Sequence, residues 1–126
     1  MVSKPNPYGK ILEDAVLSAT GEELTLMLYE GGIKFCNQAM VALEKKDIEK
    51  ANMHLQRVQE ILREFMLTLN HDYPISAQFS ALYDYMHRRA MEANTKKDPA
   101  ILNEVLSMFR SMRDTWKEAM KASRAG

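Results

Sequence analysis

The chain has 126 residues, which is the size of one compact domain with a core of its own. Its 17 basic and 17 acidic side chains cancel to a formal net charge of zero. That balance argues against a general nucleic-acid binder, because such affinity comes largely from neutralising phosphates. A single cysteine, Cys36, excludes an intramolecular disulfide framework.

Two features of the sequence bear on location. No run of about 18 apolar residues, the length that crosses a membrane, occurs in the chain. Residues 1–8 contain no apolar stretch of the kind found in a secretory signal peptide. Together with the lone thiol, these observations predict a cytoplasmic (cytosolic) protein with no membrane insertion.

The first 19 residues are expected to form a cap segment. Apolar side chains recur in it at helical spacing over fewer than three turns: Tyr8, Ile11, Leu12, Ala15 and Val16. A helix so short is marginal in water and needs a surface on which to lie. Pro5, Pro7 and Gly9 around its start favour a detachable lid, and the alternative is a fixed extra helix that completes the core.

The next segment, 21–45, is predicted to be a helix that begins with a capping box between Thr20 and Glu23. Its apolar residues form two stripes about 120° apart. The first stripe is Leu24, Leu28, Phe35, Ala39 and Leu43, and the second is Leu26, Tyr29, Ile33, Cys36 and Met40. This helix either lies deepest in the core or offers an apolar groove to a partner. The pair Gly31-Gly32 indicates either a close backbone approach or a bend.

Three more helices are predicted at 47–69, 75–94 and 98–121. The second helix carries a 3,4 heptad of apolar residues: Ile48, Ala51, Leu55, Val58, Leu62, Phe65 and Leu69. Asp47 and Asp98-Pro99 are typical helix starts, and Asn70 is a plausible helix stop. Short links force neighbouring helices to be antiparallel. The fold prediction is therefore all-α, an antiparallel up-down-up-down four-helix bundle. The domain prediction is a single unit, 1–126, with a cap at 1–19, a bundle at 20–121 and a tail at 122–126.

Catalytic and metal-binding patterns are weak. A di-iron bundle needs two Glu-x-x-His motifs, whereas Asp84 and His87 give one Asp-x-x-His. The five glycines form no phosphate-binding loop, and Cys36 falls on an apolar stripe with no histidine nearby in the sequence. We expect no catalytic residue, no metal and no cofactor. Surface recognition is the remaining class, and Met53 and Leu67 fall off the apolar stripes as candidates.

An ordered set of motifs resembles the flagellin-specific export chaperone of bacterial flagella, over about residues 6–120. The motifs are Asn6-Pro7-Tyr8, Thr20-Gly21-Glu22-Glu23-Leu24, Met27-Leu28-Tyr29-Glu30-Gly31, Leu82-Tyr83-Asp84-Tyr85-Met86, Glu92-Ala93-Asn94 and Arg113-Asp114-Thr115-Trp116-Lys117-Glu118-Ala119. Gly21 departs from this family, which usually carries Pro there, and Gly32 replaces a small side chain.

The resemblance implies an antiparallel bundle with a short N-terminal cap and no cofactor or nucleotide. It implies a chaperone that holds the disordered C-terminal part of flagellin, prevents premature polymerisation and escorts flagellin to the export apparatus. The family's tyrosine that matches Tyr8 belongs to the cap, which moves when the client binds. The export gate and an anti-sigma regulator are further partners that the family suggests.

From the stripes and the resemblance together we expect a flagellin-binding or cap surface. Its candidate residues are Tyr8, Ile11, Leu12, Leu26, Tyr29, Ile33, Met40, Met53 and Leu67. The competing interpretation is a self-associating helical scaffold or adaptor without a dedicated client, in which the same apolar faces meet in a homodimer.

Overall fold

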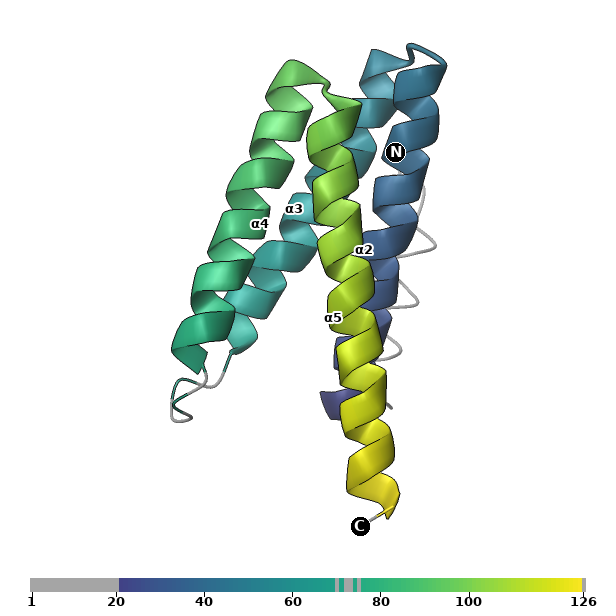
Figure 1. Cartoon of the computed structure of the whole chain (residues 1–126). Helices are drawn as coiled ribbons and strands as arrows, with labels where there is room; N and C mark the ends of the chain where they lie inside the picture. The colour runs from purple at the N-terminus through teal and green to yellow at the C-terminus, as the bar shows by residue number, and fades with distance from the viewer. Residues whose placement is uncertain (1–20, 70, 72–73, 75, 126) are drawn as a thin grey trace, which may run out of the picture.

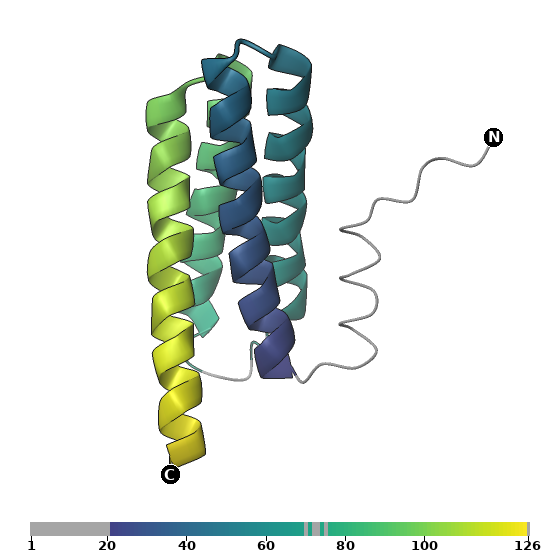
Figure 2. The same cartoon turned by 90° about the vertical axis from the view of Figure 1, so that its right-hand side faces the viewer.

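The computed structural model describes residues 21–69, 71, 74 and 76–125, with side chains described as far as Lys121. The described residues form four α-helices, numbered α2 (Gly21–Glu44), α3 (Ile48–Thr68), α4 (Ser76–Lys96) and α5 (Pro99–Ala125). The described residues include no strand. The helices run alternately up and down, as Figures 1 and 2 show, which confirms the predicted bundle.

The helix boundaries agree with the sequence prediction to within one or two residues, except at the C-terminal end. There α5 continues to Ala125 and takes in most of the segment that was expected to be a tail. Residues 121–125 contain no glycine or proline, so nothing in them stops a helix. The predicted capping box at Thr20 and the predicted stop at Asn70 lie outside the described residues.

The four helices form a ring in which each packs against two neighbours: α2 on α3 and α5, and α4 on α3 and α5. The contact between α4 and α5 is the smallest of the four. Figure 1 shows these two helices diverging towards the end at which α5 finishes, and α5 projects past the start of α2. The bundle is therefore packed most tightly around α2.

Both short turns lie at the same end of the bundle and have the same chemistry. Each contains Lys-Lys-Asp, and its second lysine, Lys46 or Lys97, has a positive φ of 57° or 51°. In the first turn, N–H of Asp47 donates to the Ala42 carbonyl at 2.8 Å, which is the closing bond of a Schellman motif. The Asp98 N–H makes the equivalent bond to the Ala93 carbonyl at 3.1 Å.

The same two aspartates start the helices that follow. The Asp47 carboxylate accepts a hydrogen bond from the Lys50 N–H at 3.1 Å, and the Asp98 carboxylate accepts one from the Ala100 N–H at 2.9 Å. Each aspartate therefore ends one helix with its backbone and caps the next with its side chain. This confirms the predicted helix starts. Each reversal of chain direction is therefore determined by the few residues of its turn.

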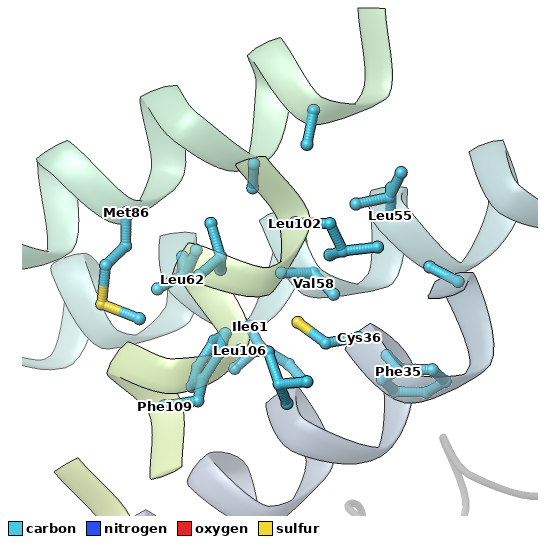
Figure 3. Close-up of a cluster of buried hydrophobic side chains, with 14 of the residues drawn as sticks. Phe35, Cys36, Leu55, Val58, Ile61, Leu62, Met86, Leu102, Leu106 and Phe109 are labelled. Carbon is cyan, nitrogen blue, oxygen red and sulfur yellow. The ribbon is translucent and has the colours of Figure 1, made fainter. Parts of the chain in front are cut away.

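The core contains the predicted stripes, and Figure 3 shows part of it. Residues Ala51, Leu55, Val58, Leu62 and Phe65 of the α3 heptad are buried. Ile48 is the exception, because it is 53% exposed at the first turn of α3. Ile48 thus continues the predicted stripe beyond the core, because a side chain at the very end of a bundle has no further layer to cover it.

The closest approach of two helices occurs between α2 and α5. The fully buried Phe109 ring lies directly over Gly32, and a β-carbon on Gly32 would be 2.6 Å from Cζ of that ring. Real β-carbons do not approach a neighbour so closely. Of the two explanations for Gly31-Gly32, a close backbone approach therefore holds at Gly32.

This contact predicts the effect of a single methyl group. Gly32→Ala should lower the free energy of unfolding by about 1–3 kcal/mol, because the added carbon overpacks the core against Phe109. Gly21→Ala is the matched control, since a β-carbon there meets nothing within 4 Å. Urea denaturation monitored by circular dichroism measures both. Adding Phe109→Leu to Gly32→Ala should recover part of the loss, and equal effects of the two alanine variants would contradict the prediction.

Candidate functional site

Packing against the two neighbouring helices, α3 and α5, explains most of the wide apolar arc of α2. Leu28, Phe35 and Ala39 from the first predicted stripe are buried, and so are Tyr29 and Cys36 from the second. The sequence alone allowed either a deep position or an open groove. The structure combines them: the middle of the arc is core, and one edge of it remains partly exposed.

Tyr29 belongs to the core. Its side chain is 3% exposed, and its hydroxyl forms a 2.7 Å hydrogen bond with the hydroxyl of Tyr83 from α4. The Phe65 ring of α3 stacks on both tyrosine rings, with centroid distances of 4.6 and 5.0 Å. Burial raises the pKa of both phenols. Tyr29 thus ties three helices together, and it is not exposed for a partner to touch.

The partly exposed edge of α2 faces outwards between α2 and α5. Leu26, Ile33 and Met40 lie along it, seven residues apart, and each is half-buried. Ile33 and Met40 pack against the core, and part of each side chain remains exposed. Seven residues are two helical turns, so these three side chains form a straight row. We call Leu26, Ile33 and Met40 the α2 row.

Two contacts fix the register of α2 against α5. The indole N–H of Trp116 donates to the Glu22 carbonyl at 2.9 Å, and Phe109 covers Gly32. Near the first of these contacts lies a hollow of about 520 Å³, lined by Leu26 of α2 and by residues of the α5 end. The lining residues on α5 are Asp114, Lys117, Glu118, Met120 and Lys121. The α2 row therefore begins at a depression between the two helices.

A second hollow, of about 380 Å³, lies between α2 and α3 at the opposite end of α2. Val41, which is 48% exposed, and His54 are among its lining residues. The Nδ1 atom of His54 is buried without a hydrogen-bond partner in the described part of the chain, and burial lowers the pKa of this imidazole. The sequence prediction did not include either residue, because neither lies on an apolar stripe.

The remaining candidates are on another face or cannot be placed. Met53 and Leu67 are 49% and 81% exposed on the outside of α3. They are 14 residues apart, so about 21 Å separates them along the helix. Tyr8, Ile11 and Leu12 lie outside the described residues. The structure therefore brings Leu26, Ile33 and Met40 together, and it places Met53 and Leu67 elsewhere.

The side chains considered as catalytic or metal-binding groups either contact a charged neighbour or are buried. Asp84 of the Asp-x-x-His pattern forms an ion pair with Arg88 at 3.0 Å, and His87 contacts Arg63 at 3.3 Å. Cys36 is fully buried, and burial raises the pKa of its thiol to about 12, against a smaller opposing effect of the Arg110 charge. Among the described residues, no group of three or more His, Cys, Asp or Glu side chains could hold a metal ion.

Within the residues that the structure describes, no helix is both long enough and apolar enough to cross a membrane. What the described surface offers is contact: a row of half-buried apolar side chains and two shallow hollows.

Comparison with known proteins decides the family. A family model described as "Flagellar protein FliS" matches residues 4–123. The chain belongs to the FliS family. It is 43% identical over 119 residues to the flagellar secretion chaperone FliS of Bacillus subtilis, covering 94% of this chain and 90% of that protein. It is 27% identical to the protein of the same name from Escherichia coli, covering 90% of this chain and 86% of that protein.

A solved structure agrees with the fold. The crystal structure of a flagellar chaperone from bacteria superimposes with a TM-score of 0.77, covering 91% of this chain and 95% of that one at 14% sequence identity. The FliS relatives support a role in flagellar export for this protein. The family resemblance read from the motifs is thereby confirmed.

The tyrosine pair gives a prediction that separates core from surface. Tyr29→Phe should lower the free energy of unfolding by about 1–2 kcal/mol, because it leaves the buried Tyr83 hydroxyl without its partner. The double variant Tyr29→Phe/Tyr83→Phe should lose less than the sum of the two single variants. Thermal denaturation measures these differences.

Tyr85→Phe provides the control for this pair. The Tyr85 hydroxyl donates to Glu104 at 2.9 Å from a half-exposed position, so water can replace the lost bond. Its loss should cost less than that of Tyr29. Additive effects of Tyr29→Phe and Tyr83→Phe would show that the two hydroxyls act independently.

Proposed function

We propose that this FliS-family protein is a non-catalytic, cytosolic export chaperone. It binds the disordered C-terminal region of flagellin, prevents premature polymerisation and delivers flagellin to the flagellar export apparatus. The observation that carries the proposal is family membership over nearly the whole chain, including the 43% identity to a flagellar secretion chaperone. The α2 row and the exposed residues of α3 are consistent with a protein that works by contact.

The physics of holding a disordered client favours an extended binding surface. Ordering a client residue costs about 1–2 kcal/mol in backbone entropy, and apolar burial returns about 25 cal/mol per Å². A single small pocket cannot offset that cost for a segment of several turns. The α2 row, which spans two heptads, gives such a segment a continuous apolar track.

Ile33, in the middle of the α2 row, is the residue best placed to test flagellin binding. Ile33→Asp should weaken the binding of a C-terminal flagellin fragment from the same organism by about tenfold or more, as measured by isothermal titration calorimetry. Met91→Asp is the matched control, because it makes a similar change at an exposed position of α4, outside the row and both hollows.

Circular dichroism must show that both variants keep their helicity. An Ile33→Asp variant that loses helical signal would indicate core damage rather than a binding role. If the flagellin fragment fails to bind the unaltered protein, the proposed client is wrong. A stable dimer in light scattering that ignores the fragment would instead favour a self-associating scaffold.

The N-terminal cap segment is proposed to compete with the client. Its residues Tyr8, Ile11 and Leu12 would cover part of the apolar surface of α2 when no client is bound. Deleting residues 1–17 should then leave the bundle folded, with flagellin affinity unchanged or increased in calorimetry. A shortened chain that cannot fold would show that these residues complete the core.

A further inference from the structure

Helix α3 has a half-buried histidine at each of its two interfaces. His54 of α3 faces α2, where its ring stacks on the Phe35 ring with the two centroids 6.2 Å apart. His87 of α4 reaches α3, and its Nε2 atom lies 3.3 Å from Nη1 of Arg63. The sequences of α2 and α5 contain no histidine, and His71, between α3 and α4, is exposed. Imidazole contacts in the described bundle are therefore concentrated around α3.

The contact between Arg63 and His87 requires a neutral imidazole. A guanidinium has N–H donors and no acceptor, so the lone pair of His87 Nε2 must accept this hydrogen bond. The proton of the neutral ring is then on Nδ1. A second proton would occupy the lone pair and would place two positive groups 3.3 Å apart. Protonation of His87 therefore replaces a bond between α3 and α4 with a repulsion.

The charges beside His87 also favour its neutral form. Arg63 is the charged group that faces it from α3, and Asp84 is a carboxylate on its own helix. Asp84 forms an ion pair with Arg88 at 3.0 Å, which partly neutralises its field. Burial and the Arg63 charge lower the pKa of His87, against a smaller opposing effect of Asp84.

His54 is kept neutral by different surroundings. Its Nδ1 atom is buried without a hydrogen-bond partner among the described residues, so a proton there would be a buried donor with no acceptor. The charged residues of the hollow beside it are Lys45 and Asp47 of the turn and Lys50 of α3, and the α2 residues that line this hollow are uncharged. The Asp47 carboxylate is 4.0 Å from the Lys50 ammonium. Burial, and after it the Lys50 charge, lowers the pKa of His54.

We propose that these two neutral histidines make the attachment of α3 sensitive to pH, so that mild acid weakens its contacts with both α2 and α4. The interface between α2 and α5 is held differently, by Phe109 against Gly32 and by the indole hydrogen bond of Trp116, and neither contact titrates. The inference concerns the bundle itself and goes beyond the proposed chaperone function, because it does not depend on the identity of the client.

Proton linkage gives the direction of the effect. Both imidazoles bind a proton less readily in the folded bundle than in the unfolded chain, so acid favours the unfolded chain. The stabilisation is complete above the unfolded-state pKa of about 6.5, and it is lost progressively as the pH falls from there towards the lower folded-state pKa. From about pH 7.5 to 5.5, each histidine can raise the unfolding equilibrium constant by at most about tenfold. Carboxylates with ordinary pKa values of about 4 stay largely ionised over this range.

Urea denaturation at constant ionic strength measures this effect. The unfolding equilibrium constant of the unaltered protein should be several-fold larger at about pH 5.5 than at about pH 7.5. His54→Phe/His87→Gln should remove most of the difference, because phenylalanine keeps a ring against Phe35 and glutamine keeps an acceptor for Arg63. His71→Gln is the matched control, since it removes an exposed imidazole and should keep the full difference. A pH-independent unaltered protein, or a double variant that keeps the whole difference, would overturn the proposal.

Proton–nitrogen correlation NMR of the histidine rings provides a second test, which needs only the unaltered folded protein. It should show the His87 proton on Nδ1 at neutral pH, and both His54 and His87 should titrate below the ordinary value of about 6.5. Arg63→Gln should raise the pKa of His87 and leave that of His54 unchanged, whereas Lys50→Gln should do the reverse. A proton on Nε2 of neutral His87, or ordinary titration of both rings, would contradict the proposal.

Discussion

The approach of α2 to α5 at Gly32 is the constraint on which the arrangement of the bundle depends. Only a residue without a β-carbon allows the fully buried Phe109 ring to lie against the α2 backbone. The contact fixes the register of the first and last described helices, and Trp116 extends it with a hydrogen bond to Glu22.

The four helix–helix interfaces (seams) of the bundle differ in the interactions that stabilise them, and the difference bears on function. Tyr85, Arg89 and Glu104 bridge α4 and α5 with charged hydrogen bonds, while Asn52 and Asn94 bridge α3 and α4 at 2.8 Å. The outside of the α2–α5 seam has half-buried apolar residues in the corresponding place. A surface whose polar groups are satisfied internally gains little from a partner, whereas a partly exposed apolar surface gains from being covered.

The sequence was most informative where a local rule determines structure. The heptad from Ala51 to Phe65 predicted the buried face of α3, because apolar spacing on a helix translates directly into burial. Asp47 and Asp98 predicted two helix starts for the same reason. The repeated Lys-Lys-Asp was a further local signal, since both turns form the same Schellman reversal.

Prediction of the candidate site from sequence was less complete, because membership of a surface depends on which helices meet. Tyr29 and Ile33 share a stripe in sequence, yet Tyr29 is buried, with its hydroxyl bonded to Tyr83, whereas Ile33 is only half-buried. That bond joins residues 54 positions apart, which no local pattern reveals.

The order of the helices around the ring has a mechanical consequence. Of the four seams between the described helices, the one between α2 and α5 is the only one whose two helices are not joined directly by a stretch of chain. The other three pairs are consecutive in sequence, so a connection limits how far each can separate at one end. The α2–α5 seam has no such tether, so side-chain contacts set its register, among them Phe109 against Gly32 and the Trp116 hydrogen bond to Glu22.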